Sequence, residues 1–574
     1  MKQLQGIAAS KGIAIGPAFL YRVELPELPV RLDVDPAEEL ERFEQSVTAV
    51  REHLDAIEER KRGQMHADNF EILEVQKVLL SDEEYGDRIR DRIQNKSLNA
   101  EAAVQEVTET VVADFSALED EYFSQRAADV ADLGSRLLRN LLGVPDVDLS
   151  GLEEPVILLA HDLSPSDTIG FELDKIIALC TEVGSSTSHT AIVARSMGIP
   201  AIVGVGPMDV DEGTTVILDG NEGVCLADPD EQTLGKYRKR KRQEDKRREQ
   251  LLNMAEQPAV TTDGVHIHCV ANVSGPESAR AAAEHGADGV GLLRSEFLFL
   301  ERSTLPDENE QYAAYMQIAE FLPDTTIVVR TLDVGGDKSV PAIKLPKEEN
   351  PFLGHRAIRL TLERDNLFTP QIRALLRTAA ARDVRIMIPF VSTLTELREA
   401  RTRIMAIQAD MKAAGDPVCE NPKIGIMVEI PSAAIMADAF AAEADFFSIG
   451  TNDLCQYTMA VDRTNAKVAD LADFLDPAVL HLIKRSIDAA ERAGIPVAMC
   501  GEMAGSVIAV PLLLGMGLRE FSMSSSQLPE VKDLIRRLSA DECRPLVDTC
   551  MRAETAQDVR SVLQDFLDSR LSRS

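Results

Sequence analysis

The chain has 574 residues, of which 45% are hydrophobic and 27% charged, and its formal net charge is −34. This length corresponds to about three or four domains of a globular protein. The negative charge disfavours nucleic-acid binding. No apolar run reaches the ~20 residues of a membrane span, and the N-terminus lacks a signal-peptide pattern. The eight cysteines form no CxxC pairs, which argues against structural zinc and a disulfide framework. We therefore expect a cytoplasmic protein that binds neither nucleic acid nor membranes.

The first 228 residues alternate between sequence patterns typical of strands and patterns typical of helices. Small and β-branched residues over 5–20 predict one or two strands with glycine turns. Between about 35 and 143, apolar residues such as Leu40, Phe43 and Val47 recur at helical spacing and predict a helical bundle. Apolar runs over 156–160, 176–180, 202–203, 216–220 and 223–225 then predict further strands. The bundle is therefore expected to be inserted into a small β/α domain.

A charge-rich segment over 229–258 is predicted to be a helical connector. Its basic run over 236–248 can also indicate nucleic-acid binding. The connector interpretation is favoured, because the segment joins two domains of an acidic protein and consists of helix-forming residues. Beyond it, eight strands alternate with helical segments, as in a TIM barrel. These strands are expected at 265–271, 289–293, 327–331, 384–390, 423–429, 445–449, 496–500 and 520–523.

The predicted fold is therefore a multidomain α/β protein with a β/α domain, an inserted α-helical bundle, a helical linker and a C-terminal (β/α)8 barrel. The expected boundaries are 1–30 plus 144–228 for the β/α domain, 31–143 for the bundle, 229–258 for the linker and 259–574 for the barrel.

Reactive residues fall at the predicted C-terminal ends of the barrel strands, where TIM-barrel active sites lie. They comprise four arginines, two carboxylates, an amide and a thiol: Arg294, Arg330, Arg356, Arg463, Glu429, Asp453, Asn452 and Cys500. Arginine binds phosphate and carboxylate in bidentate fashion, and two carboxylates suit Mg²⁺. A thiol can deliver a proton to carbon. The set predicts phosphoryl transfer from a small phosphorylated acid.

A second candidate lies in the β/α domain, where a small polar loop over 184–188 precedes His189 and a predicted helix. A helix N-terminus with small polar neighbours suits an anion, and a neutral imidazole can attack a phosphoryl group. Taken alone, the loop is better explained by a structural histidine near a helix cap. The barrel residues shift the interpretation towards a phosphoryl acceptor.

The chain resembles Enzyme I of the bacterial phosphoenolpyruvate:sugar phosphotransferase system over about residues 3–570. The resemblance rests on Asp445–Thr458, on Asn350–Arg359 and on the His189 segment. The family usually has Gly and Arg where this chain has Ser185 and Ser186, Trp at His355 and Thr at Cys455.

The resemblance implies a homodimeric phosphotransferase with two steps. Phosphoenolpyruvate would bind on the barrel, with Mg²⁺ on Glu429 and Asp453, and with its phosphate and carboxylate held by the four arginines and Asn452. His189 would take the phosphoryl group, Cys500 would protonate the enolate to pyruvate, and the phosphate would pass to the carrier protein HPr. Thr168 would hydrogen-bond the histidine. The residues expected to dock HPr are Asp82, Glu83, Glu84 and Arg126. The sugars that lie downstream do not follow from the resemblance.

Three alternatives stay open at this point. Pyruvate phosphate dikinase and phosphoenolpyruvate synthase share the histidine domain and the barrel, but they need an ATP-binding domain that this sequence lacks. A nitrogen-branch paralogue usually carries a sensory domain in front, and none precedes residue 1. A regulatory protein with an inactive barrel would be free to lose members of the set that is intact here.

Overall fold

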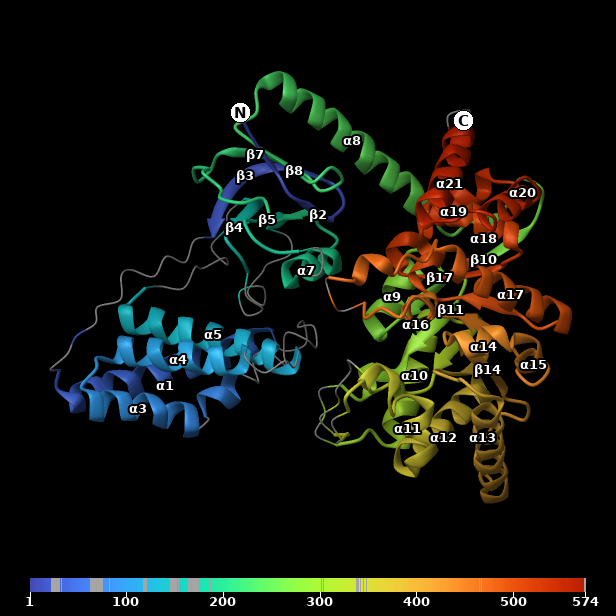
Figure 1. The fold of residues 1–574 in the computed structure, drawn as a ribbon, viewed down its shortest axis with the longest axis horizontal. Helices are drawn as coiled ribbons and strands as arrows, with labels where there is room; N and C mark the ends of the chain where they lie inside the picture. The colour runs from blue at the N-terminus through green and yellow to red at the C-terminus, as the bar shows by residue number, and fades with distance from the viewer. Residues whose placement is uncertain are drawn as a thin grey trace. The chain divides into compact units, whose positions relative to one another are not determined.

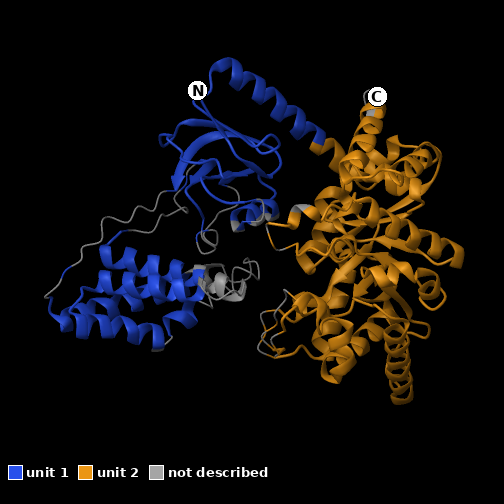
Figure 2. Cartoon of the chain, viewed as in Figure 1, with its two compact units in different colours: residues 1–247 blue, residues 248–574 orange. Residues whose placement is uncertain are grey.

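A computed structural model represents the chain, which divides into two compact units, residues 1–247 and 248–574 (Figure 2). It describes residues 1–21, 31, 34–61, 76–81, 83–116, 121–144, 152, 154–163, 167, 175–185, 188–300, 302, 304–336, 340, 342–343, 345–346, 348–463, 465 and 467–571. The boundary between the units falls inside the predicted linker. The finer division into four domains stays a prediction.

The β/α part of the first unit is built on an eight-stranded sheet in the order β1-β8-β7-β3-β4-β5-β6-β2. Five strands match the predicted runs: β4 Val156–Ala160, β5 Ile176–Thr181, β6 Ala201–Val203, β7 Thr215–Asp219 and β8 Val224–Ala227. The prediction of one or two strands over residues 5–20 is confirmed by β2 Ile7–Ser10 and β3 Ile13–Tyr21, and a further strand, β1 Lys2–Gln5, precedes them. Gly6 and Gly12 cause the breaks. Gly12 has φ +122°, and a Cβ on Gly6 would lie 2.7 Å from the Val203 carbonyl.

The helical part of the first unit is a bundle of α1 Pro36–Lys61, α3 Glu83–Lys96, α4 Ala100–Ser116 and α5 Glu121–Leu142 (Figure 1). Its core includes Phe43, Val50 and Leu54, which recur at helical spacing along α1, together with Val104 of α4 and Leu133 of α5. Residues 62–75 of the predicted bundle lie outside the described residues, and a helical turn at 76–80 follows them.

The linker helix α8 Glu231–Asn253 is attached to the β/α domain by its first two turns. Leu234 and Tyr237 are buried against strand residues such as Ile217, and Arg240 forms an ion pair with buried Asp219 at 3.0 Å. None of the side chains over 241–253 is buried. The predicted helix in this segment is therefore confirmed, and its role as a linker over 229–258 stays a prediction.

The second unit contains a closed barrel of eight parallel strands, with the short strand β9 Ala259–Val260 paired antiparallel to the first of them. The barrel strands are β10 His266–Val273, β11 Val290–Arg294, β12 Ile327–Arg330, β13 Val384–Ile388, β14 Lys423–Val428, β15 Phe447–Ile449, β16 Val497–Met499 and β17 Glu520–Met523. All eight predicted strands are present. The pairing of β10 with both β11 and β17 closes the ring.

Helices surround the barrel strands on the outside (Figure 1). They are α9 Pro276–Glu284, α10 Glu308–Phe321, α11 Ile358–Glu363, α12 Asp365–Ala381, α13 Leu394–Ala414, α14 Pro431–Ile435, α15 Ala437–Ala441, α16 Thr451–Met459, α17 Pro477–Ala493, α18 Val510–Met516, α19 Leu528–Arg537, α20 Ala540–Cys550 and α21 Ala556–Leu571. A small buried cluster brings together residues from four of the strands and two residues next to strand ends: Leu292, Val328, Met387, Met427, Phe446 and Cys500. The barrel interior is thus packed, as is usual for this fold.

The chain segment that follows α8 is held on the barrel by buried Lys532 of α19. The Lys532 ammonium forms an ion pair with Asp288 at 2.7 Å and donates to the carbonyls of Gly286 (2.5 Å) and Ala255 (3.2 Å). Arg536 donates to the carbonyl of Gln257 at 3.0 Å. These bonds fix residues 255–257 to the barrel.

Candidate active site

Arg330 lies at the centre of a buried charge network at the C-terminal end of β12. Its guanidinium forms ion pairs with Glu296 and with Asp333, the latter at 3.0 Å. Desolvation lowers the pKa of Arg330, but the carboxylates of Glu296 and Asp333, with smaller contributions from Glu429 and Asp453, outweigh it and raise the pKa. Arg330 is thus a permanent cation whose charge is balanced by the protein.

Arg356 is held beside Arg330 through a shared carboxylate. Its guanidinium donates to Asp333 at 2.9 Å and to the Tyr457 hydroxyl at 3.2 Å, and it lies over the Phe390 ring at 4.6 Å. Gly335 allows this approach, because a Cβ there would lie 2.5 Å from the Arg356 Cβ. Asp333 therefore fixes two arginines at once, one on each carboxylate oxygen.

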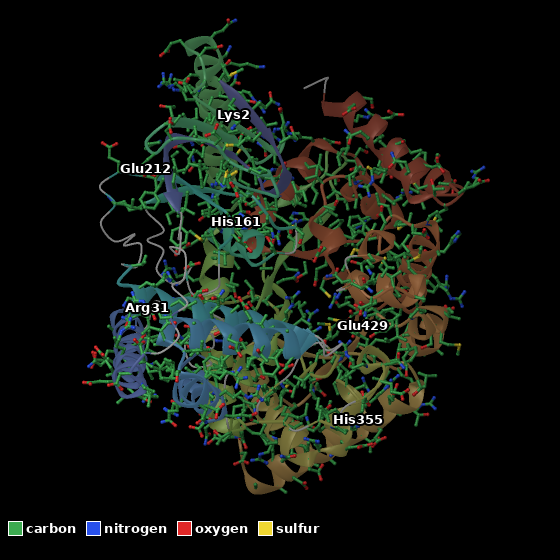
Figure 3. The ribbon with its side chains drawn as sticks, turned by 60° about the vertical axis from the view of Figure 1, so that its left-hand side comes forward. Lys2, Arg31, His161, Glu212, His355 and Glu429 are labelled. Atoms are coloured by element: carbon green, nitrogen blue, oxygen red, sulfur yellow. The ribbon has the colours of Figure 1, made fainter. Side chains whose placement is uncertain are left out.

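The two predicted metal ligands are buried carboxylates that interact electrostatically. Glu429 directly follows β14 (Figure 3), and Asp453 lies in the first turn of α16. Burial raises the pKa of Glu429 to about 8, and the negative charges of Asp453 and Asp333 add to the shift. Asp453 forms ion pairs with Arg463 at 3.5 Å and with Arg356 at 3.6 Å, but its buried Oδ1 makes no hydrogen bond.

Glu429 is oriented by a strained backbone position. The Phe390 amide donates to its Oε1 at 2.6 Å. Phe390 has φ +59°, in the left-handed region that bulky residues avoid at a cost of roughly 1–2 kcal/mol. This strained conformation directs the Phe390 N–H group towards the Glu429 carboxylate. Backbone strain of this kind is typical of functional sites.

Cys500 directly follows β16 and is buried with its sulfur towards the Ile449 carbonyl, 3.7 Å away. Burial raises the pKa of the thiol to about 11, so the thiol stays protonated at neutral pH. The next residues are held by Asn452, whose Oδ1 accepts from the Glu502 amide at 3.0 Å. Protonated Cys500 is suited to act as an acid rather than as a nucleophile.

Arg294 and Arg463 complete the arginine set. Arg294 ends β11 and is in register with Arg330 on β12. Its side chain is exposed, yet desolvation by nearby protein atoms and the positive charge of Arg330 lower its pKa. Arg463 reaches the same region through its ion pair with Asp453. An exposed guanidinium without a balancing anion is available for an anionic ligand.

Sequence analysis missed three residues that hold this arrangement: Gln371, Glu296 and Asp333. Gln371 of α12 accepts from the Leu332 amide at 2.9 Å and donates to Ser295 at 3.0 Å, so it joins the ends of β11 and β12. Glu296 and Asp333 lie in loops that contain assigned arginines, and a buried carboxylate next to an arginine is the signal that would have found them. Nothing in the sequence marks Gln371, because it lies on an apolar helix.

The eight barrel residues predicted for the site all lie in the second unit, on strand ends, in loops and in the first turn of α16. His189 belongs to the first unit, where it is the first residue of α7 His189–Met197. Ser188 caps that helix by accepting from the Ala191 amide at 3.4 Å. Ser185 accepts from the Ser188 amide at 3.0 Å.

The predicted carrier-docking residues and Thr168 are only partly within the described residues. Asp82 and Thr168 lie outside them, and Glu83 and Arg126 belong to α3 and α5 without described side chains. Glu84 on α3 forms an ion pair with Arg88 at 2.6 Å. These assignments stay predictions.

Comparisons with known proteins agree with this geometry. Models of the PEP-utilising enzymes match residues 248–540 (PEP-binding domain), 5–126 (N-terminal) and 152–223 (mobile domain). The phosphoenolpyruvate-protein phosphotransferase of Priestia megaterium is 42% identical over 562 residues, which is 97% of this chain and 98% of the relative. The chain belongs to the phosphoenolpyruvate-protein phosphotransferase family.

The chain is also similar to a second curated protein over nearly its full length and to a solved structure over part of its length. The phosphoenolpyruvate-protein phosphotransferase of Bacillus subtilis is 40% identical over 569 residues, covering 98% of this chain and all of the relative. A solution structure of an Enzyme I protein is 38% identical over 42% of this chain and 99% of its own, with a TM-score of 0.39. Within the described residues, no helix of this family member is long and apolar enough to cross a membrane.

Proposed function

We propose that this chain transfers the phosphoryl group of phosphoenolpyruvate to its own His189 and then to a histidine of the carrier protein HPr. Its family membership makes it a phosphoenolpyruvate-dependent protein phosphotransferase. The observation that carries the proposal is the buried network of arginines and carboxylates at the strand ends. This network presents several fixed cations to an anionic substrate, and none of its described members is a histidine.

Glu429 and Asp453 fit a divalent cation, and we propose Mg²⁺. Asp453 has a buried oxygen without a hydrogen bond, and Glu429 has a raised pKa that a nearby cation would reverse. Two carboxylates suffice for Mg²⁺, which keeps waters and binds substrate oxygens. When bound, the ion neutralises charge on the phosphoryl oxygens.

Arg294, Arg330, Arg356 and Arg463 would hold the phosphate and carboxylate of phosphoenolpyruvate, with Asn452 donating to one of them. An imidazole nitrogen of His189 attacks phosphorus, and the bond between phosphorus and the enol oxygen breaks. The enolate carbon C3 then takes the thiol proton of Cys500, which gives pyruvate. The thiolate regains its proton from water.

The second transfer needs movement, because His189 belongs to one unit and the barrel residues to the other. The β/α domain that carries His189 is proposed to swing about the linker and to present the phosphate to HPr. The match of residues 152–223 to a mobile domain supports this step. HPr is proposed to dock beside Asp82, Glu83, Glu84 and Arg126, with Thr168 supporting His189, and the enzyme is proposed to dimerise through the barrel.

The test is incubation of the purified full chain with ³²P-labelled phosphoenolpyruvate and Mg²⁺, followed by addition of HPr. We expect an acid-labile, base-stable label on His189 that chases to HPr, and no label on the His189→Ala variant. Absence of label from the wild-type chain would refute the activity. A labelled His189→Ala variant would refute the assignment of the site.

A further inference from the structure

Asn272 on β10 contacts the backbone of the residue proposed to protonate the substrate. Its side-chain amide donates from Nδ2 to the Cys500 carbonyl at 3.1 Å, and its Oδ1 accepts from the Ser522 hydroxyl at 2.6 Å. Ser522 lies on β17, between β10 and β16 in the barrel. The Asn272 amide therefore spans one strand to reach the end of the next.

The Cys500 carbonyl lies just beyond the regular ladder of its strand. The pairing of β16 with β17 runs through Ala498 and Met499 and ends there. Asn272 supplies a donor where this pairing stops. The Cys500 amide donates to the Ile449 carbonyl at 3.0 Å. The backbone is therefore held on both sides of the Cys500 side chain.

The residues after Cys500 are fixed as well. A Cβ on Gly501 would lie 1.8 Å from the Thr451 hydroxyl, so the turn packs directly on the start of α16. Gly291 leaves room for the Ser522 side chain, because a Cβ at position 291 would lie 2.5 Å from the Ser522 hydroxyl. The Ser522 hydroxyl orients the Asn272 amide so that its NH2 group, not its oxygen, faces the Cys500 carbonyl.

We propose that Asn272, oriented by Ser522, is a positioning residue that fixes the Cys500 thiol for proton delivery to one face of the enolate. This inference rests on the proposed function, in which Cys500 is the acid. The thiol is a single donor on a short side chain, so its direction depends on the two peptide groups beside it. If these two peptide groups become mobile, the enol of pyruvate leaves the site before the thiol protonates it. It then takes its proton from water on either face.

The experiment uses the full-length protein in a single turnover. Phosphoenolpyruvate carrying deuterium at one position on C3 is mixed with stoichiometric enzyme and Mg²⁺ in tritiated water. Phosphorylation of His189 and the configuration of the chiral methyl group of pyruvate are both measured. The wild-type enzyme is expected to give one configuration.

For Asn272→Ala we expect phosphorylation of His189 within about threefold of wild type and a racemic methyl group, because loss of one hydrogen bond leaves the arginines intact. Ser522→Ala should give a partial loss of selectivity. Ser526→Ala, which removes an exposed hydroxyl near the same strand end, should behave as wild type. A general loss of structure would slow phosphorylation and leave the configuration of any product unchanged.

Full selectivity in Asn272→Ala would overturn the proposal, even with phosphorylation intact. If Asn272→Ala does not fold, Ser522→Ala decides, and selectivity equal to that of Ser526→Ala would overturn the proposal. Failure of wild-type enzyme to label His189 is a different result, which would refute the proposed function. A racemic product from wild-type enzyme would refute the role of Cys500.

Discussion

Asn452 and Glu502 are joined by two hydrogen bonds. The Glu502 amide donates to Asn452 Oδ1 at 3.0 Å, and Asn452 Nδ2 donates to the Glu502 carboxylate at 3.3 Å. Asn452 is the residue whose amide we propose to bind the substrate. In this arrangement its NH2 group is already engaged by an exposed carboxylate, which the substrate has to displace.

Replacement of Glu502 should therefore favour substrate binding. In Glu502→Gln a neutral acceptor replaces a charged one, and the competing bond weakens by about 1 kcal/mol. We expect KM for phosphoenolpyruvate to fall by roughly threefold to fivefold with kcat nearly unchanged. Steady-state kinetics measure this, with Glu491→Gln, an exposed carboxylate on α17, as the matched control. An increased KM would contradict displacement of Glu502 by the substrate.

The carboxylate shared by Arg330 and Arg356 should be essential for the stability of the barrel. Asp333→Asn keeps the shape but places an NH2 group against one guanidinium and removes the anion that the two buried cations share. Breaking a buried ion pair costs roughly 3–5 kcal/mol. Calorimetry should show a lower melting temperature for the barrel transition. The control variant Asp383→Asn removes a surface ion pair with Arg385, at 3.7 Å, and should leave the melting temperature nearly unchanged.

In the metal-free enzyme, ionisation of buried Glu429 should lower the free energy of unfolding as the pH rises. Its folded pKa of about 8 exceeds the ordinary value of 4.5, so the folded state binds the proton more tightly than the unfolded state. The stability contributed by the protonated form is full below about pH 4.5 and is lost progressively up to about pH 8, by at most ~1.4 kcal/mol per pH unit.

Glu429→Gln removes this dependence. Without metal, the difference in melting temperature between Glu429→Gln and wild type should therefore grow in favour of the variant between pH 5 and pH 8. Phosphorylation of His189 should be lost, since the variant lacks a metal ligand. A difference that does not change with pH would mean that Glu429 is already ionised in the folded protein.

Gly335 provides a test of the packing around Arg356. Gly335→Ala places a Cβ 2.5 Å from the Arg356 Cβ in a backbone with φ +110°. Gly415→Ala has a similar φ of +80° and nothing within 4 Å, so it isolates the cost of backbone strain. We expect both variants to lose some stability and only Gly335→Ala to raise KM for phosphoenolpyruvate by tenfold or more. Equal kinetics would show that Arg356 does not depend on this close approach.

The barrel could be predicted from sequence because each of its strands is a short apolar run between helical segments. Arg294, Arg330, Glu429 and Cys500 could be located for the same reason, since they directly end or follow those runs. The resemblance to a known family added roles to these positions. Local pattern and long-range fold agree in this half of the chain.

The contacts that fix the site could not be predicted in the same way. Gln371 and Asn272 act through side chains that cross from one element to another, and their sequence neighbours carry no sign of it. The strained backbone of Phe390 depends on tertiary packing around Glu429. Strand β1 was not predicted, because its pairing with β8 joins distant parts of the sequence and local alternation does not report such a contact.

The attachments at the two ends of the linker limit where a swinging motion can arise. Leu234, Tyr237 and Arg240 bind α8 to the β/α domain, and Lys532 and Arg536 bind residues 255–257 to the barrel. A loop hinge at either end would have to break buried ion pairs. The exposed stretch 241–253 can bend by opening a few backbone hydrogen bonds, each worth about 1 kcal/mol. The β/α domain and the barrel would then be joined by a helix that bends, and the stiffness of that helix would set how often His189 reaches the barrel.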